Sequence, residues 1–322
     1  MEREPTTLQE AVVYFSNPAN CLEYLVPRRW ADGKVLCPTC GTDRVTFQPA
    51  HNRWQCSVHH SRRQFTLKTG TIMEDSPIGL DKWLTAMWLV ASNRNGISSW
   101  ELHRALNITQ KTAWFLLHRI RLAMQDEQSG GKLGGEVEVD ETYIGGKARN
   151  MHKSRKLRAL AGRGGSAAGK IGVQGMLERG GKVRTVVMRD TTQGTLIPNI
   201  NRNVEKGSHV FTDEAQVYFG LQANYNHEVI NHAVSYVEGN VHTNGMENFW
   251  SLLKRTIKGT YISVEPYHLF RYLDEQAFRF NNRKPMSDGD RFSFLVRKVT
   301  GKRLTYAALI GKTEAGPIPA VC

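Results

Sequence analysis

The chain has 322 residues, enough for two or three small domains and at least one sizeable core. Lys and Arg number 43 against 30 Asp and Glu, so the net charge is +13, and this excess favours phosphate-rich partners. No apolar run reaches about 18 residues, which excludes a membrane-spanning helix. The first residues carry acids and lack the apolar core of a signal peptide. The five cysteines are few and unevenly spaced, which indicates a reducing compartment rather than a disulfide framework.

The predicted elements form a helical first part and an α/β second part. Apolar spacing predicts a short helix over 8–26, and residues 79–126 are helical in pattern and contain no Pro. Glycines crowd residues 130–135 and predict a flexible linker. Strand-like runs then cover 136–144, 171–177, 183–188 and 209–212, and helical runs cover 192–204, 243–257 and 266–281. Strands interleaved with helices predict a mixed α/β domain.

Cysteines and histidines with metal-ligand spacing lie in the segment before the helices. Cys37 and Cys40 form a Cys-x-x-Cys knuckle, and Cys56 follows with His59 and His60 just behind it. Two thiolates on one knuckle and two ligands on a second complete a tetrahedral Zn²⁺ site. Zinc would also fold a segment that is too short to build much core of its own. The fourth ligand is His59 or His60, since the spacing permits both.

Residues 97–124 have the spacing of a helix-turn-helix. Ser98 caps a first helix that breaks at Asn107, and Thr109 caps a second helix. The start of that second helix is placed to face a DNA major groove, although an ordinary helical hairpin has the same spacing. The DNA-binding residues predicted on it are Gln110, Lys111 and Arg119.

Three acidic residues suggest the chemistry. Asp140 lies in an alternating strand-like run, Asp213 ends another, and Glu247 lies in an amphipathic helix. Phosphodiester chemistry needs charge neutralised on the attacking and leaving oxygens, which two divalent ions about 4 Å apart supply when carboxylates hold them. Mg²⁺ or Mn²⁺ suits such oxygen ligands. We therefore expect Asp140, Asp213 and Glu247 to be catalytic metal ligands that act on nucleic acid.

Polar residues near Glu247 are candidates for supporting roles. Lys254 lies seven residues after Glu247, so it shares one helix face with the carboxylate and can contact a DNA phosphate. His242 and Asn244 come just before the helix.

Neighbouring residues compete with each member of the triad. If the register of the strand differs, Glu138 or Glu141 is the metal ligand in place of Asp140. Glu214 competes with Asp213 in the same way. Asn244 either assists or replaces Glu247.

A basic stretch follows Asp140 at residues 145–170. From Lys147 to Lys170 the stretch carries Lys and Arg without any acid, and glycine and serine crowd its second half. This composition predicts a mobile loop, and its place favours contact with the DNA backbone over a solvated insertion. The DNA-binding residues predicted here are Lys147, Lys153, Arg155 and Lys156.

Several stretches together resemble insertion-sequence transposases of the ISXO-like group. They are RRQFTLKTGTIMEDSPIGLDKW, GISSWELHRALNITQKTAWFLLHRIRLAM, VEVDETYIGG, VFTDEAQVY, HTNGMENFWSLLKR and HLFRYLDEQAFRFNNR. The resemblance implies an N-terminal zinc ribbon, a helical DNA-binding segment of helix-turn-helix type, and an α/β, RNase H-like catalytic domain. It implies Asp140, Asp213 and Glu247 as the metal-binding triad of DDE type. It also favours His60 over His59, because relatives place a histidine just before the basic RRQF stretch.

The resemblance therefore implies a transposase that binds the ends of an insertion sequence. It would cleave DNA by two-metal phosphodiester hydrolysis with Mg²⁺ or Mn²⁺ and join the 3′ ends to target DNA. The implied partners are double-stranded DNA, as terminal repeats and as target, and further copies of the chain, in the bacterial cytoplasm at the nucleoid. The alternative is a DNA-binding regulator or inactive transposase remnant that binds element ends without cutting, which the intact triad argues against.

Four parts of the chain follow from this interpretation. They are an N-terminal helix and zinc ribbon (1–70), a helical DNA-binding segment (71–130), an RNase H-like DDE domain (131–283) and a C-terminal tail (284–322). Within the tail, residues 298–306 are interpreted as a solvated segment rather than a DNA-contacting arm.

Overall fold

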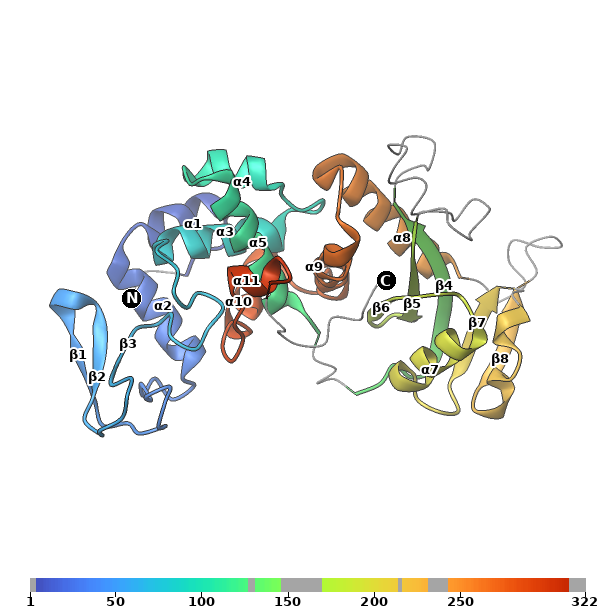
Figure 1. Cartoon of the computed structure of the whole chain (residues 1–322), viewed down its shortest axis with the longest axis horizontal. Coiled ribbons are helices and arrows are strands. Elements are labelled where there is room, and N and C mark those ends of the chain that lie inside the picture. The colour runs from blue at the N-terminus through green and yellow to red at the C-terminus, as the bar shows by residue number, and fades with distance from the viewer. Residues whose placement is uncertain (1–3, 127–130, 146–169, 214–215, 231–242, 313–322) are drawn as a thin grey trace. The chain divides into compact units, whose positions relative to one another are not determined.

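The computed structural model describes residues 4–126, 131–145, 170–213, 216–230 and 243–312 (Figure 1). The chain divides into two compact units. The first contains Met1–Gln125 and Asn282–Ile318, and the second contains Asp126–Asn281. None of the helices in the described residues has both the length and the apolar composition needed to cross a membrane.

The first unit contains a small antiparallel sheet in the order β1-β2-β3. Its strands are β1 (Val45–Gln48), β2 (Arg53–Cys56) and β3 (Gln64–Phe65). Aromatic rings supply its core, because Trp54 stacks on Phe65 with ring centroids 5.9 Å apart and meets Phe47 at 4.9 Å. A sheet this small buries little else, which is why a metal is a reasonable second source of stability.

Helices make up the rest of the first unit. They are α1 (Leu8–Phe15), α2 (Pro18–Arg29), α3 (Leu80–Ser92), α4 (Ser99–Leu106), α5 (Gln110–Met124), α10 (Asp288–Arg297) and α11 (Tyr306–Leu309). The single helix predicted over 8–26 is two helices. The chain starts a new helix at Pro18 because Asn17 Oδ1 accepts the Ala19 N–H at 2.9 Å, and Pro is well suited to a first helical turn.

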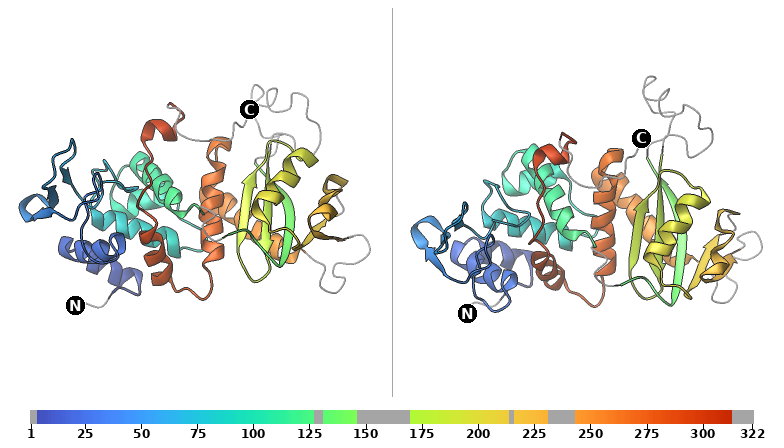
Figure 2. Two further views of the ribbon diagram at one scale, coloured as in Figure 1. Left: turned by 90° about the horizontal axis from the view of Figure 1, so that it is seen from below. Right: turned by 60° about the horizontal axis from the view of Figure 1, so that its bottom comes forward.

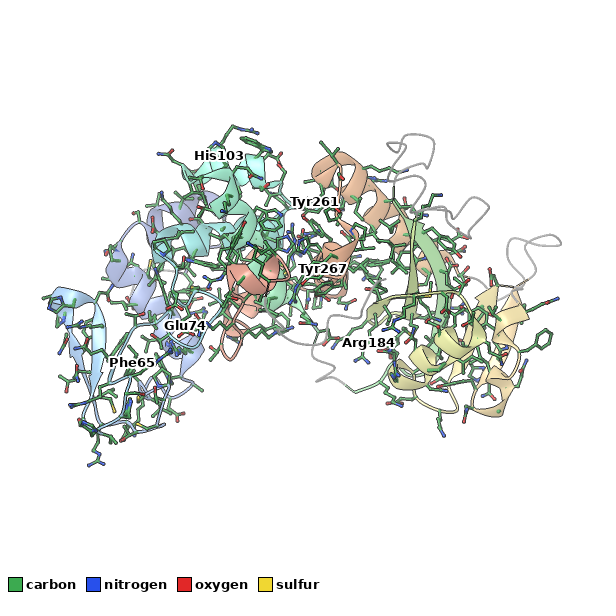
Figure 3. All side chains as sticks on the ribbon, viewed as in Figure 1. Phe65, Glu74, His103, Arg184, Tyr261 and Tyr267 are labelled. Carbon is green, nitrogen blue, oxygen red and sulfur yellow. The ribbon has the colours of Figure 1, made fainter. Side chains whose placement is uncertain are left out.

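Side chains cap the start of α4 and fix the turn between α4 and α5. Ser98 and Glu101 form a reciprocal cap at the start of α4, with Ser98 N donating to Glu101 Oε2 at 2.8 Å. Asn107 ends α4 in the left-handed region at φ 48°, and Thr109 Oγ1 caps α5 by accepting from Thr112 N. His103 Nδ1, labelled in Figure 3, contacts the Ile108 carbonyl across the turn. The predicted caps at Ser98 and Thr109 are confirmed.

The C-terminal segment packs into the first unit. The Phe292 ring of α10 lies 4.8 Å from the Trp88 ring of α3 and is 1% exposed. Val299 and Leu304 are 4% and 9% exposed. The interpretation of 298–306 as solvated is therefore wrong for these two residues, although Thr300, Gly301, Arg303 and Thr305 are exposed. Its two apolar residues are too widely spaced to give a periodic signal, yet both contribute to the core.

The second unit is built on a five-stranded mixed sheet in the order β6-β5-β4-β7-β8. β4, β5 and β6 are antiparallel neighbours, whereas β7 runs parallel to β4 and β8 parallel to β7. The strands are β4 (Glu136–Ile144), β5 (Ile171–Glu178), β6 (Val183–Val187), β7 (His209–Asp213) and β8 (Asn226–Ile230). The first four match predicted runs, and β8 has no counterpart among the predictions.

Helices cover both faces of this sheet (Figure 2). On one face, α7 (Gln193–Asn203) packs with the short turns η3 (Gln216–Tyr218) and η4 (Leu221–Ala223) against Val137 and Val139. The opposite face is packed by α8 (Asn244–Thr256), the π-turn η5 (Ile257–Tyr261) and α9 (Leu269–Asn281), and the turn η6 (Pro266–His268) precedes α9. Because side chains alternate along β4, even-numbered residues face α8 and odd-numbered residues face α7.

Candidate functional site: a zinc cluster and a group of carboxylates

The first candidate site joins the knuckle before β1 to the end of β2. Cys37 Sγ lies 3.4 Å from His60 Nε2, and Cys40 Sγ lies 3.7 Å from Cys56 Sγ. The ligand atoms of all four residues lie within 4.8 Å of one another. The sequence left His59 and His60 open by spacing, and the structure brings His60 into this group.

These distances fit a tetrahedral zinc ion. Zn–S bonds of about 2.3 Å at tetrahedral angles place two sulfurs roughly 3.8 Å apart, and a shorter Zn–N bond places sulfur and nitrogen slightly closer. The Cys40–Cys56 and Cys37–His60 separations agree with both values. Among the described residues, this is the group of thiols, imidazoles and carboxylates that gathers tightly enough for one ion. The site is therefore a Cys₃His metal site suited to Zn²⁺.

The second candidate site lies on the α8 face of the five-stranded sheet. Parallel β4 and β7 pair Glu138 with Phe211, and extending that register by two residues brings Asp140 level with Asp213. Both aspartates project from the same face because each lies two residues beyond a paired residue. The strand order therefore places side by side two residues that are far apart in sequence.

Glu247 completes this group from the first turn of α8. Burial raises the pKa of Asp140 above its usual value, and the nearby carboxylates of Asp213 and Glu247 raise it further. Hydrogen bonds from Glu141 N and Trp250 Nε1 act in the opposite direction without cancelling the rise. Asp213 and Glu247 are thus near enough to Asp140 to disfavour its charged form, although the three carboxylates do not gather as tightly as the four ligands of the first site.

Trp250 connects α8 directly to Asp140. Its Nε1–H donates to Asp140 Oδ2 at 3.0 Å, and the indole is 4% exposed. Gly175 is the cross-strand partner of Asp140 on β5. A Cβ on Gly175 would lie 2.2 Å from Met246 Cε and 2.6 Å from Trp250 Cζ2, so the absence of a side chain there lets α8 approach. Trp250 is therefore a buried residue that also contacts Asp140, and no sequence pattern identified this contact.

The competing glutamates on β4 have other partners. Glu138 is 1% exposed, pairs with Arg179 and accepts the Met246 N–H. Glu141 lies on the α7 face, where it accepts a hydrogen bond from the Tyr218 hydroxyl. Asp140 differs from both, because Asp213 and Glu247 each act on its charge.

Other predicted residues near this site are only partly within the described chain. Asn244 and Lys254 lie on α8 and are both exposed. The residues that lie outside the described part of the chain are His242, Glu214, Lys147, Lys153, Arg155 and Lys156.

The predicted DNA-binding residues of α5 differ in exposure. Lys111 is exposed, with its ammonium 4.6 Å from the centroid of the Tyr306 ring, whereas Gln110 is half-buried and donates to Ser99 Oγ at 2.9 Å. Arg119 is buried, and its guanidinium donates to the carbonyls of Leu304 at 3.0 Å and Glu74 at 2.6 Å. This use of Arg119 inside the unit argues against the predicted DNA contact. A basic residue was mistaken for a surface residue because charge alone does not reveal burial.

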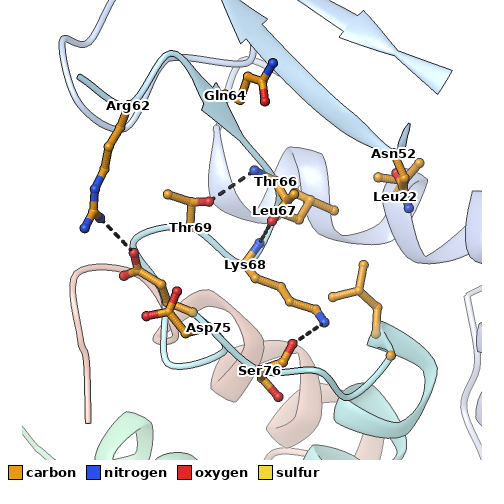
Figure 4. Close-up of a pocket in the computed structure, with 13 residues that line it drawn as sticks. Leu22, Asn52, Arg62, Gln64, Thr66, Leu67, Lys68, Thr69, Asp75 and Ser76 are labelled. Atoms are coloured by element: carbon orange, nitrogen blue, oxygen red, sulfur yellow. Dashed lines mark hydrogen bonds and ion pairs between the residues drawn. The ribbon is translucent and has the colours of Figure 1, made fainter. Parts of the chain in front are cut away.

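A pocket of about 580 Å³ in the first unit is lined by residues between the ribbon and α3 (Figure 4). Its charged groups bond within the protein. Lys68 Nζ donates to the Ser76 carbonyl at 3.0 Å, and Arg62 Nη1 lies 3.3 Å from Glu74 Oε1. None of the candidate carboxylates lines it. The pocket is therefore interpreted as a space left where the ribbon packs against the helices, and not as a ligand site.

Comparison with known proteins finds a transposase family in each of the two units. A family described as ISXO2-like transposase domain matches residues 132–281, and one described as transposase zinc-ribbon domain matches residues 16–58. An uncharacterized protein in transposable element ISH50 of Halobacterium salinarum is 27% identical over 252 residues, which is 75% of this chain and 83% of that protein. An uncharacterized transposase-like protein of Haemophilus influenzae is 34% identical over 121 residues, which is 37% of this chain and 95% of that protein.

Proposed function

The chain belongs to the ISXO2-like transposases, and on that premise we propose that it binds the ends of an insertion sequence, cleaves the DNA and joins the 3′ ends to target DNA. The observation that carries the proposal is geometric. The register of parallel β4 and β7 sets Asp140 level with Asp213, and the first turn of α8 carries Glu247 near them, where both carboxylates add to the burial that raises the pKa of Asp140. Such a concentration of negative charge is costly unless cations are held there.

The catalytic unit is assigned to the RNase H-like fold. Three antiparallel strands followed by two strands parallel to the central one, with helices on both faces, support this assignment. The aspartates come from adjacent strands β4 and β7, and the glutamate comes from α8, which covers their common face.

Asp140 and Asp213 would hold two Mg²⁺ or Mn²⁺ ions, and Glu247 would complete one of the two sites. Bound ions of this kind neutralise charge on the attacking and leaving oxygens of a phosphodiester. Water then attacks phosphorus, the P–O3′ bond breaks, and a 3′-hydroxyl is released at the end of the element. In the second reaction that hydroxyl attacks a phosphodiester of target DNA. Lys254 is exposed on the same helix as Glu247, where it would contact a DNA phosphate.

Recognition of the element ends is assigned to the first unit. The zinc ribbon and the capped α4–α5 pair, a helix-turn-helix-like arrangement, are its DNA-binding elements, with Lys111 exposed at the start of α5. Two ends must be held together for joining, so we assign the active form to a homo-oligomer on DNA.

Cleavage and joining of a labelled element-end duplex test this function. Wild type with Mg²⁺ is expected to nick and join the duplex. The variants Asp140→Ala, Asp213→Ala and Glu247→Ala are expected to bind the duplex and to lose both reactions by at least about a thousandfold. If wild type binds the ends but does not cleave them with any divalent ion tested, the protein is a DNA-binding regulator instead. If only Glu247→Ala stays active, the third ligand is Asn244.

A further inference from the structure

Helix α8 begins without a cap of its own. Its N-cap residue, Thr243, makes no side-chain hydrogen bond to the first turn. The first backbone N–H groups of a helix need acceptors, and a carboxylate is a favourable one because it also complements the helix dipole. Glu138 of β4 supplies this acceptor, with Met246 N donating to Glu138 Oε2 at 2.9 Å.

The carboxylate of Glu138 is held firmly in this position. Its side chain is 2% exposed, and Arg179 Nε donates to Glu138 Oε1 at 3.1 Å. A Cβ on Gly245 would lie 2.8 Å from Glu138 Oε2 and 2.5 Å from Leu177 Cδ2. The helix therefore reaches the carboxylate only because residue 245 has no side chain.

A second contact ties the next turn of α8 to the same strand. Trp250 Nε1 donates to Asp140 Oδ2, so Glu138 and Asp140, two residues apart on one face of β4, each bond to α8. Their partners on the helix, Met246 and Trp250, lie on either side of Glu247 in sequence. Glu247 is therefore carried by a helix segment that is fixed at both ends.

We propose that Glu138 is a positioning residue that sets Glu247 at its distance from Asp140. The inference rests on the proposed function, because it assigns the purpose of the contact to the metal site. Glu138 itself touches neither metal nor DNA in this scheme. It acts through the Met246 N–H and the start of α8.

The test compares Glu138→Gln with Glu136→Gln in the full-length, zinc-loaded protein. Glu136 is a matched control, because it lies on the same face of β4 and also pairs with Arg179, Nη1 to Oε2 at 3.0 Å, whereas this pairing does not reach α8. Three quantities are measured: amide hydrogen exchange at Met246 and Glu247, Mn²⁺ affinity by calorimetry without DNA, and the Mg²⁺ concentration for half-maximal cleavage.

Glu138→Gln is expected to speed amide exchange at Met246 at least tenfold. It is also expected to raise two metal constants about tenfold each, namely the dissociation constant for Mn²⁺ and the Mg²⁺ concentration for half-maximal cleavage. Glu136→Gln is expected to change each quantity less than twofold. A merely structural role would instead lower the melting temperature while leaving the metal constants unchanged, and that result would overturn the inference. Equal effects of the two variants would overturn it as well. If Glu138→Gln does not fold, Glu138→Asp takes its place, since it keeps the charge beside Arg179 but withdraws the carboxylate by one methylene.

Failure of this inference and failure of the proposed function give different results. If wild type cleaves and the Glu138 variant keeps wild-type metal constants, the inference fails and the transposase function stands. If wild type does not cleave, the proposed function fails, and the exchange and Mn²⁺ measurements without DNA still decide whether Glu138 positions α8.

Discussion

Asp140 and Glu141 are adjacent residues that serve opposite faces of β4. Asp140 faces α8 and the other carboxylates, and Glu141 faces α7 and bonds to the buried Tyr218 hydroxyl. Glu141 N also donates to Asp140 Oδ1 at 2.8 Å, so the position of one residue constrains the other. Burial raises the pKa of Glu141 from 4.5 to about 7, and the neighbouring Asp140 and Asp213 contribute to the rise.

This shift predicts how stability depends on pH. An acid whose pKa is higher in the folded state stabilises the fold fully below its unfolded pKa, and this contribution is lost as the pH rises through the folded pKa. For Glu141 the loss falls between pH 4.5 and about 7. Glu141→Gln, which is neutral at every pH, is therefore expected to be more stable than wild type at pH 8 by up to roughly 3 kcal/mol, and similar to it near pH 4.5.

Urea unfolding in Mg²⁺-free buffer measures the difference in the free energy of unfolding between Glu141→Gln and wild type. The exposed Glu205→Gln serves as control, and a Glu141→Gln advantage that is the same at both pH values would contradict the prediction.

At the scale of elements, α8 depends on close approach to β5. The cross-strand partner of Asp140 is Gly175, and the space over it is filled by Met246 and Trp250. Packing at this density leaves no room for an added methyl group.

Gly175→Ala is expected to lower the free energy of unfolding by about 1–3 kcal/mol, because the Cβ forces α8 outward or the two side chains out of their rotamers. The rate of DNA cleavage is expected to fall as well, because the added methyl group would displace Trp250 and weaken its hydrogen bond to Asp140. Gly259→Ala is the control, because a Cβ there meets nothing within 4 Å. Denaturant unfolding of both variants checks this, and equal stability of the two would show that α8 accommodates the methyl group.

The zinc ribbon is the other element whose integrity depends on few residues. Its sheet is small and its remaining core is aromatic, so loss of one ligand is expected to cost the metal and the local fold together. Cys56→Ala and His60→Ala are expected to lose zinc, while Cys21→Ala and His59→Ala retain it. Native mass spectrometry of the purified variants measures the bound zinc. Retention by His60→Ala with loss in His59→Ala would reverse the assignment of the fourth ligand.

For the whole molecule, the net charge of +13 governs association with DNA. Each Lys or Arg that neutralises a phosphate releases a counterion, so affinity falls as salt rises. We expect the association constant for an element-end duplex to fall at least about a hundredfold between 50 and 200 mM salt. Fluorescence anisotropy with an element-end duplex and a scrambled duplex of equal length measures it. A similar fall for both duplexes is expected, because phosphate contacts carry no sequence information. An affinity that does not change with salt would show that charge has little part in binding.

The whole chain also shows where sequence patterns stopped being informative. The C-terminal residues return to the first unit, where Phe292 and Leu304 complete its core. The basic residues of α5 were expected on a DNA-facing surface, but Arg119 is bonded to two backbone carbonyls inside the unit. In both cases the outcome depends on contacts between segments about two hundred residues apart, which periodicity does not report.

The sequence by itself determined the features that depend on neighbours along the chain. These are the Cys-x-x-Cys knuckle, the caps at Ser98 and Thr109, the bounds of β4 and the face of β4 that carries Glu138 and Asp140. Only the tertiary structure decided that His60 joins the three thiols, and that Glu138 and Asp140 both bond to α8. The physical reason is that local spacing states which side of an element a residue occupies. Which side chains lie opposite is settled by the packing of elements that are distant in sequence.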